Sequence, residues 1–314
     1  MPTFDKSISR DSAGKALIPD SYVNSVLQEA THSSVVLQRA KNVRLSSKKT
    51  TQPVLATLPD AYWLQGDTSL KQTSDVTWSD LTITAEELAV IVPIPDAVLA
   101  DANINLWDSI KPLLAQAIGK KVDQAALFGV DKPTSWPEGV VASATAAGNV
   151  VELAAGKDMG VAVAELGEKL AGQGYAINGF ASAPGLQWKL VGLRDQQGTP
   201  IYTTGLAGST PTGLYGYPLN ECLNGSWNAT AAQLLAADWS KFVVGIRQDI
   251  TYEIFREGVV SDETGKVIVN LMQQDMKAMR VVMRVGFQVA APATSLASGE
   301  TKRYPAGIIT PAAG

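Results

Sequence analysis

Cysteine and histidine are nearly absent from this chain of 314 residues, which has one of each, Cys222 and His32. A single cysteine excludes a disulfide within the chain and a zinc site built from cysteines. A single histidine excludes a histidine cluster for a metal, and it leaves any serine–histidine–aspartate triad dependent on His32 alone. We therefore expect no metal, no cofactor and no catalytic residue.

Long hydrophobic runs are also missing. The longest, Leu88–Pro95, is less than half of the roughly 20 residues that cross a bilayer. The N-terminus has no apolar stretch of the kind found in secretory signals, so we expect folding in the cytosol and no membrane contact. With 46% hydrophobic and 18% charged residues, the composition is that of a globular protein. The mean hydropathy of +0.05 is high for a soluble monomer and favours burial of surface against other chains.

Positive charge is scarce and unevenly placed. The net charge of -4 leaves the whole chain without a basic footprint for nucleic acid. Residues 1–50 nevertheless carry eight basic and four acidic side chains, a balance of +4, so the remainder carries -8. Two interpretations stay open: a basic arm that contacts the acidic body of an identical subunit, or an ordinary solvated terminus.

The stretch between residues 85 and 140 is the most informative. Its continuous apolar run, Leu88–Ile94, predicts a strand buried on both faces. Apolar residues then recur with a period near 3.6 and predict a long helix over residues 105–128. Asn105 is a plausible N-cap of this helix and Gly129 a plausible C-cap.

The segments on either side of residues 85–140 differ in their residue patterns. Before this stretch, two strand-like segments joined by a polar tip predict a long hairpin, which as an isolated ribbon would be marginal in water and so should lie on a neighbouring subunit. After it, alternating helices and short strands, Leu214–Leu219 among the strands, predict an α/β unit with a long loop at 194–211. Long strands return from Phe242, and the last residues are predicted to form a loose tail.

Strand, ribbon and long helix in this order resemble the HK97-fold major capsid proteins of tailed bacteriophages. The resemblance is strongest over residues 18–140 and weaker over 238–291. The segments that carry it are LIPDSYVNSVLQEATHSSVVLQRA, PVLATLPDAYWLQGDTSLKQTSDVTW, EELAVIVPIPDAVLADANINLW and AIGKKVDQAALFGVDKPTSWPEGV. Their order and local sequence together are specific, although no short motif among them would suffice alone.

This resemblance implies an α+β, HK97-like capsid fold with an inserted domain. Its parts would be an N-terminal arm (1–40), an extended loop formed by a β-ribbon (41–86), a peripheral domain (87–137 and 246–291) with a spine helix (105–128), an axial domain (138–245) and a C-terminal tail (292–314). The extended loop would lie over an adjacent subunit, and the loop near 194–211 would point toward the capsomer axis.

The resemblance also implies a structural, non-enzymatic function. Subunits would form hexamers and pentamers that close into an icosahedral head around double-stranded DNA, which they would contact nonspecifically. The head would assemble in the cytoplasm of the host bacterium and become part of the virion. Because the arm starts close to Met1, we expect scaffolding, if used, to come from a separate protein. A portal and decoration proteins are further expected partners.

Some members of this family join subunits through a lysine–asparagine isopeptide bond that a nearby carboxylate promotes. Lys71 near the ribbon tip and Asn270 in the peripheral domain are the matching candidates, while the spacing of Asp275 departs from the expected pattern. The bond requires a neutral, desolvated amine. A solvated Lys71 that forms intersubunit salt bridges is the other interpretation.

Two alternative functions stay open at this point. An encapsulin-type cellular compartment uses the same fold to enclose an enzyme, and its cargo would distinguish it from a phage head. A cytosolic hydrolase that uses Cys222 belongs to a different class. No histidine or basic residue near Cys222 in the sequence would lower the pKa of its thiol, which favours a buried structural role.

Overall fold

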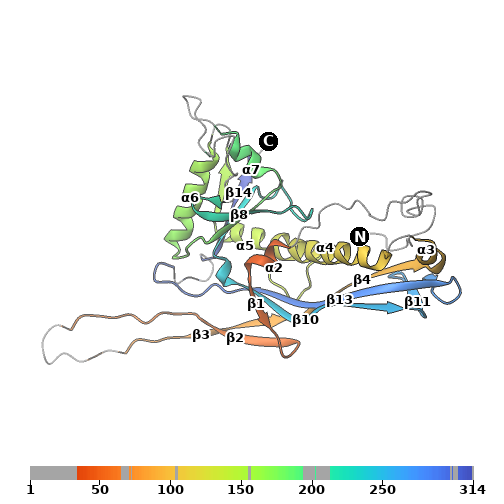
Figure 1. The fold of residues 1–314 in the computed structure, drawn as a ribbon. Helices are drawn as coiled ribbons and strands as arrows, with labels where there is room; N and C mark the ends of the chain where they lie inside the picture. Colours follow the sequence, from red (N-terminus) through yellow and green to blue (C-terminus); the bar gives the residue numbers. More distant parts are fainter. Residues whose placement is uncertain are drawn as a thin grey trace.

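The computed structural model describes residues 34–64, 71, 73–102, 105–154, 157–193, 202, 213–297, 299 and 303–312. His32 and most of the predicted 194–211 loop lie outside these residues. A long helix runs between a lower four-stranded sheet and an upper six-stranded sheet, and a two-stranded ribbon projects from the lower sheet (Figure 1).

The lower sheet has the strand order β1-β10-β13-β4, in which only the β1–β10 pair is parallel. Its strands are β1 (Lys41–Arg44), β10 (Phe242–Phe255), β13 (Met276–Val289) and β4 (Glu86–Pro95). Alternate side chains of β13 are buried in the main hydrophobic core, as the period of two in a strand requires. They are Met279, Val281, Met283, Val285 and Phe287.

The long helix, α4 (Leu106–Phe128), confirms the predicted helix. Gly129 ends it in the left-handed conformation, with φ of 68°, and its N–H donates to the Ala125 carbonyl at 3.1 Å. Asn105 is the N-cap residue, but its side chain does not accept a cap hydrogen bond. Its amide Nδ2 donates instead to Oδ2 of Asp108 at 2.6 Å.

Strand β4 is the edge strand of the sheet and differs from its prediction in the burial of its two faces. Leu88, Val90 and Val92 pack against the main core, whereas Ile91, on the opposite face, is 47% exposed. The prediction of burial on both faces is therefore wrong for this half of the strand, because the described residues leave the second face partly exposed. The short helix α3 (Asp96–Asp101) follows directly.

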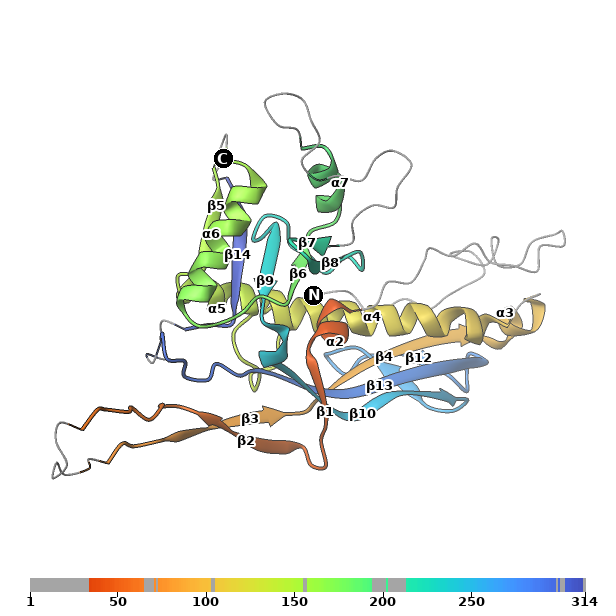
Figure 2. The same cartoon turned by 60° about the vertical axis from the view of Figure 1, so that its left-hand side comes forward.

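The upper unit is a six-stranded sheet with helices packed against it (Figure 2). Its strand order is β5-β14-β9-β6-β8-β7. Its elements are α5 (Val140–Ala146), β5 (Val150–Leu153), α6 (Met159–Gly172), β6 (Gly179–Ser182), α7 (Leu186–Val191), β7 (Gly213–Leu214), β8 (Tyr217–Glu221), β9 (Leu234–Ala237) and β14 (Ala306–Pro311), with the 3-10 helix η2 (Trp239–Lys241) leading to β10.

The segment predicted as one strand over Leu214–Leu219 is instead a tight hairpin of β7 and β8. Tyr215 and Gly216 form its turn with positive φ angles of 52° and 83°. Two central residues with positive φ are typical of the two-residue turns that match the twist of a hairpin.

The end of the chain corrects the expectation of a loose tail over 292–314. Residues 306–311 form β14, which pairs parallel with β5 and antiparallel with β9 in the interior of the upper sheet. Ile308 is buried in the main core and Ile309 in the core beneath α6, so both faces of β14 are covered. The tail prediction is therefore wrong for these residues.

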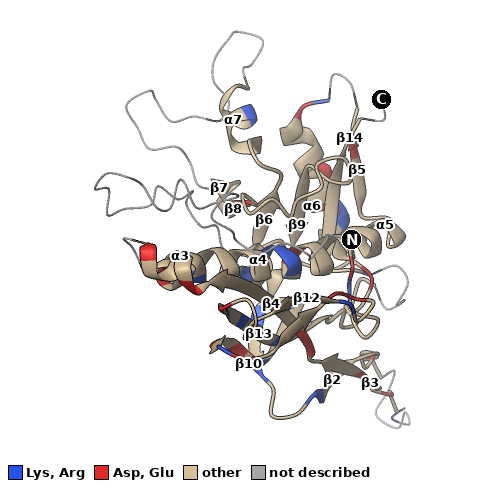
Figure 3. Cartoon of the chain, turned by 90° about the vertical axis from the view of Figure 1, so that its right-hand side faces the viewer, with Lys and Arg blue, Asp and Glu red and all other residues tan. Residues whose placement is uncertain are grey.

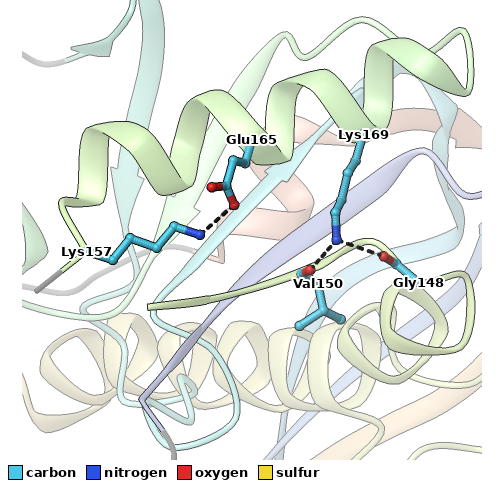
Figure 4. Close-up of polar contacts among 5 residues, drawn as sticks. All are labelled: Gly148, Val150, Lys157, Glu165 and Lys169. Carbon is cyan, nitrogen blue, oxygen red and sulfur yellow. Dashed lines mark hydrogen bonds and ion pairs between the residues drawn. The ribbon is translucent and has the colours of Figure 1, made fainter. Parts of the chain in front are cut away.

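Helix α6 packs on this sheet and also protects its β5 edge (Figure 4). Lys169 Nζ donates to the Val150 carbonyl at 2.7 Å and to the Gly148 carbonyl at 3.4 Å. One turn earlier on the same face of the helix, Glu165 forms an ion pair with Lys157. Edge strands expose backbone groups that pair readily with other chains, so the Lys169 contacts limit extension of the sheet at β5.

Three smaller features complete the described fold. Helix α2 (Val35–Arg39) packs against α4. The ribbon consists of β2 (Lys49–Leu55) and β3 (Trp78–Thr84). A second hairpin, β11 (Val259–Ser261) and β12 (Val267–Asn270), lies at the end of the molecule opposite the ribbon (Figure 1).

The burial of β14 predicts that Ile309→Ala destabilises the subunit by about 2–5 kcal/mol, because it opens a cavity in a packed core. Chemical denaturation of the subunit would measure this change in the free energy of unfolding. The matched control is Leu296→Ala, at a side chain that is 68% exposed, where we expect a change within about 0.5 kcal/mol. Equal, negligible effects at both positions would contradict a structural role for β14.

Candidate assembly surfaces

The ribbon is the most prominent projecting surface of the chain. Its two strands pair in regular antiparallel register from Lys49 opposite Thr84 to Leu55 opposite Trp78. Pairing continues past the strands, where the hydroxyls of Thr57 and Thr77 lie 2.8 Å apart. The two sides of the ribbon therefore stay paired beyond the ends of β2 and β3.

The root of the ribbon is fixed where it crosses the lower sheet. Gly245 and Gly286 face each other across β10 and β13 at this point. A Cβ on Gly286 would lie 2.6 Å from the Thr84 carbonyl oxygen, and one on Gly245 would lie 2.8 Å from Cγ2 of Ile83. Only glycine allows this close approach, so the glycine pair determines where the ribbon leaves the body.

The rest of the ribbon carries large apolar side chains that its own chain does not cover. Trp63 is 97% exposed and Trp78 is 66% exposed. Exposed tryptophans are unusual on a soluble monomer, and a group of them marks a contact surface. The carboxylates of Asp60, Asp75 and Asp80 are also exposed along the ribbon, so the surface is both aromatic and acidic.

A second group of exposed apolar side chains lies at the opposite end of the molecule. Val259 and Val267 on the β11–β12 hairpin are exposed, and so is Met272 in the turn that follows. The chain thus presents apolar surface at both ends of its long axis, which suits contacts with other subunits at both ends.

The two residues proposed for a cross-link lie on these two separate surfaces. Lys71 is exposed in the segment that links β2 to β3, whereas Asn270 ends β12. The Asn270 side chain is engaged in its own turn: its Nδ2 donates to Gln273 Oε1 at 3.0 Å, and its Oδ1 accepts from the Gln273 N–H at 3.3 Å. The structure does not bring Lys71 and Asn270 together within one chain, so any bond between them would join two subunits.

The described residues provide no reactive thiol. Cys222 is fully buried, and burial raises the pKa of its thiol to about 11. A thiol with so high a pKa stays protonated at neutral pH and is a poor nucleophile. The described part of the chain also has no group of three side chains suited to a metal ion, and none of its helices is long and apolar enough to span a membrane.

Charged residues of both signs are spread over the described body (Figure 3). Several form ion pairs on the surface, such as Lys277 with Asp96 at 3.0 Å and Lys121 with Asp131 at 2.6 Å. This distribution lacks the clustered basic face typical of proteins that bind nucleic acid tightly.

A different residue, Asp123, is central to the packing and was missed by the sequence reasoning. It is a fully buried carboxylate on α4 at the junction of several segments. One signal in the sequence could have identified it: Asp123 lies between Val122 and Gln124, within the apolar pattern of the helix. A charged residue at a buried position requires hydrogen-bond partners, so such a residue indicates a specific contact.

A long helix between two sheets, with a ribbon anchored at one end, defines the architecture of a capsid shell subunit. Residues 14–294 match the model of the phage capsid family. The major capsid protein of Staphylococcus phage 80alpha is 25% identical over 272 residues, which cover 86% of this chain and 80% of that protein. A solved chain from Microbacterium phage Oxtober96 has a TM-score of 0.83 and 34% identity, covering 98% of this chain and 100% of that one. A chain from Mycobacterium phage Adephagia gives 0.83 and 33%, covering 98% and 99%.

The chain belongs to the phage capsid family. It is a major capsid protein of tailed phage heads, a structural component of the virion and not an enzyme. The predicted mixed α+β phage capsid fold is confirmed at that level, and the predicted function is confirmed. The family match favours the phage head over the encapsulin compartment and over the hydrolase.

The exposure of Trp63 predicts that Trp63→Ser leaves the subunit folded but impairs assembly, because it removes contact area and not core packing. We expect the free energy of unfolding to change by less than about 0.5 kcal/mol. Assembly, followed by sedimentation, should fall. Trp63→Tyr keeps an aromatic contact and should restore much of it. Normal assembly of the serine variant would contradict the proposed contact.

Proposed function

We propose that this protein forms hexamers and pentamers that close into an icosahedral head around double-stranded DNA. The observation that carries the proposal is the ribbon, which is anchored at its root while Trp63 on its distal part is 97% exposed. A two-stranded ribbon is marginally stable alone in water, so a surface outside the chain must support it. In this proposal that surface belongs to the adjacent subunit.

The proposal assigns a role to each part of the chain. Residues 1–40 serve as an N-terminal arm, the ribbon as the extended loop, and the lower sheet with α4 as the peripheral domain. The upper unit is the axial domain, and β14 belongs to it. Contacts in which each subunit presents different surfaces to its two neighbours generate rings, which is how one ribbon per subunit supports closed capsomers.

Other components follow from the same proposal. A separate scaffolding protein directs closure, a portal occupies one vertex, and decoration proteins bind the outer surface. The net charge of -4, with charged residues of both signs spread over the body, supports weak, nonspecific contact with the packaged DNA rather than sequence recognition.

Electron microscopy of the purified full chain tests the proposal. Closed particles with hexamers and pentamers, formed alone or on co-expression with a scaffolding protein from the same phage, are the expected result. Small oligomers under both conditions would contradict it. Nuclease-protected DNA in particles from infected cells would establish the contents.

We further propose that Lys71 of one subunit and Asn270 of another form the intersubunit contact that is open to covalent joining. In the bond-forming step, the neutral amine of Lys71 attacks the Asn270 carboxamide carbon. A C–N bond forms and the C–N bond to the side-chain amide nitrogen breaks, so that ammonia leaves. Asp275, five residues after Asn270, is exposed and is the carboxylate nearest to Asn270 in the sequence.

Denaturing gel electrophoresis of assembled heads distinguishes the covalent contact from the ionic one. A covalent contact gives a ladder of multimers that survives boiling, and Lys71→Arg abolishes the ladder because the guanidinium is never a neutral amine. Monomers alone would exclude the isopeptide bond and leave the salt-bridge interpretation. Lys189→Arg, on α7, is the matched control and should leave any ladder unchanged.

A further inference from the structure

The buried carboxylate of Asp123 on α4 accepts hydrogen bonds from two other segments of the chain. From the start of α2 it accepts the Ser34 hydroxyl at 2.5 Å and the N–H groups of Val35 and Val36, each at 3.1 Å. From the loop after β8 it accepts Nδ2 of Asn224 at 2.7 Å. Asp123 itself belongs to α4, so one side chain ties the entry of the described chain, the long helix and the upper unit together.

The backbone of α4 is shaped for this contact. Gly119 lies one turn before Asp123 and therefore on the same face of the helix. A Cβ on Gly119 would lie 3.3 Å from Cβ of Ser34 and 3.4 Å from its backbone nitrogen. The glycine lets the start of α2 approach the helix closely enough for its N–H groups to reach Asp123.

Among the described residues, no positive charge balances this carboxylate. Its hydrogen-bond partners are all neutral donors. Burial raises the pKa of Asp123 above its ordinary value, while the hydrogen bonds from Ser34, Val36, Asn224 and Val35 lower it in part. A buried charge held only by neutral donors is costly if any donor is lost.

We infer that Asp123 is a conformational latch that couples the start of α2 to the seating of the Cys222–Ser226 loop of the upper unit. The latch consists of Asp123 with Ser34, Val35, Val36 and Asn224. Both oxygens of the carboxylate are shared between partners: Oδ1 binds Ser34 and Val36, and Oδ2 binds Val35 and Asn224. If the start of α2 or the Asn224 loop is released, the buried Asp123 carboxylate loses part of its hydrogen bonding. Its contact with the other segment is then weakened as well.

Through this latch, a change in the position of the α2 start can affect the upper unit. It determines where the polypeptide enters the body at Ser34 and links that point to the upper unit across α4. This step rests on the proposed function: in an assembled shell, the latch would relate the placement of the N-terminal arm to the position of the axial domain. The coupling itself is a property of one subunit and does not require assembly.

Hydrogen–deuterium exchange on the unassembled full-length subunit tests the coupling. Ser34→Ala removes one hydroxyl donor at the α2 side only. We expect exchange to rise by roughly tenfold in residues 34–40 and also to rise in residues 222–226, which Ser34 does not contact directly. Asp123→Asn replaces one carboxylate oxygen with an NH2 group, which cannot accept hydrogen bonds from the groups that donate to Asp123. This variant should raise exchange in both segments further.

Two controls separate the latch from general loosening. Asp108→Asn makes the same substitution at an exposed position on α4 and should leave both segments unchanged. Exchange in β6 should stay at the wild-type level in all variants. Faster exchange in residues 34–40 alone would show that Asp123 only caps α2 and would overturn the coupling, as would no change in either segment. If Asp123→Asn fails to fold, the milder Ser34→Ala variant still decides the question.

Hydrogen–deuterium exchange tests the latch independently of the proposed assembly into a head. Failure to form shells in electron microscopy would count against the head architecture but would not alter exchange in isolated subunits. Uncoupled exchange with normal shells would reject the latch alone.

Discussion

The burial of α4 on two sides is the constraint on which the rest of the structure depends. One continuous hydrophobic core contains side chains of β13 below the helix and of β14 and β9 above it. A helix used in this way needs apolar residues around much of its surface, and small residues where other backbones approach. Ala125 and Ala126 are buried in this core, and Gly119 receives the start of α2. Asp123 is the exception in this apolar environment, and its hydrogen bonds show how such an exception is accommodated.

Because α4 is buried between the two sheets, it does not cover the other surfaces of the chain. The described residues do not fully cover the face of the lower sheet that is opposite α4, and Ile91 on β4 is nearly half exposed there. The ribbon leaves the body at a glycine pair and carries tryptophans into solvent. These features would be liabilities in a monomer, because exposed apolar surface favours aggregation. In a capsid protein they are the surfaces through which copies of the chain meet.

Much of the fold follows from periodicity. The apolar repeat and Gly129 located α4 and its end, and the predicted return of long strands from Phe242 located the start of β10. Prediction was wrong where topology decides burial. An apolar run such as Leu88–Ile94 has the same pattern in an edge strand as in a central one. The short stretch that becomes β14 is flanked by polar and glycine residues, and only its insertion between β5 and β9 makes it a strand.

The amino-acid sequence by itself determined the class of the protein through its long helix, its ribbon with a polar tip, and the order of segments that resembles a capsid protein. Only the tertiary structure decided which surfaces are bare and which residues meet. Lys71 and Asn270 lie on separate surfaces, and Ser34, Asp123 and Asn224 converge although they are far apart in the chain. The physical reason is that periodicity is a local property, whereas burial and hydrogen-bond partners depend on which distant segments pack together.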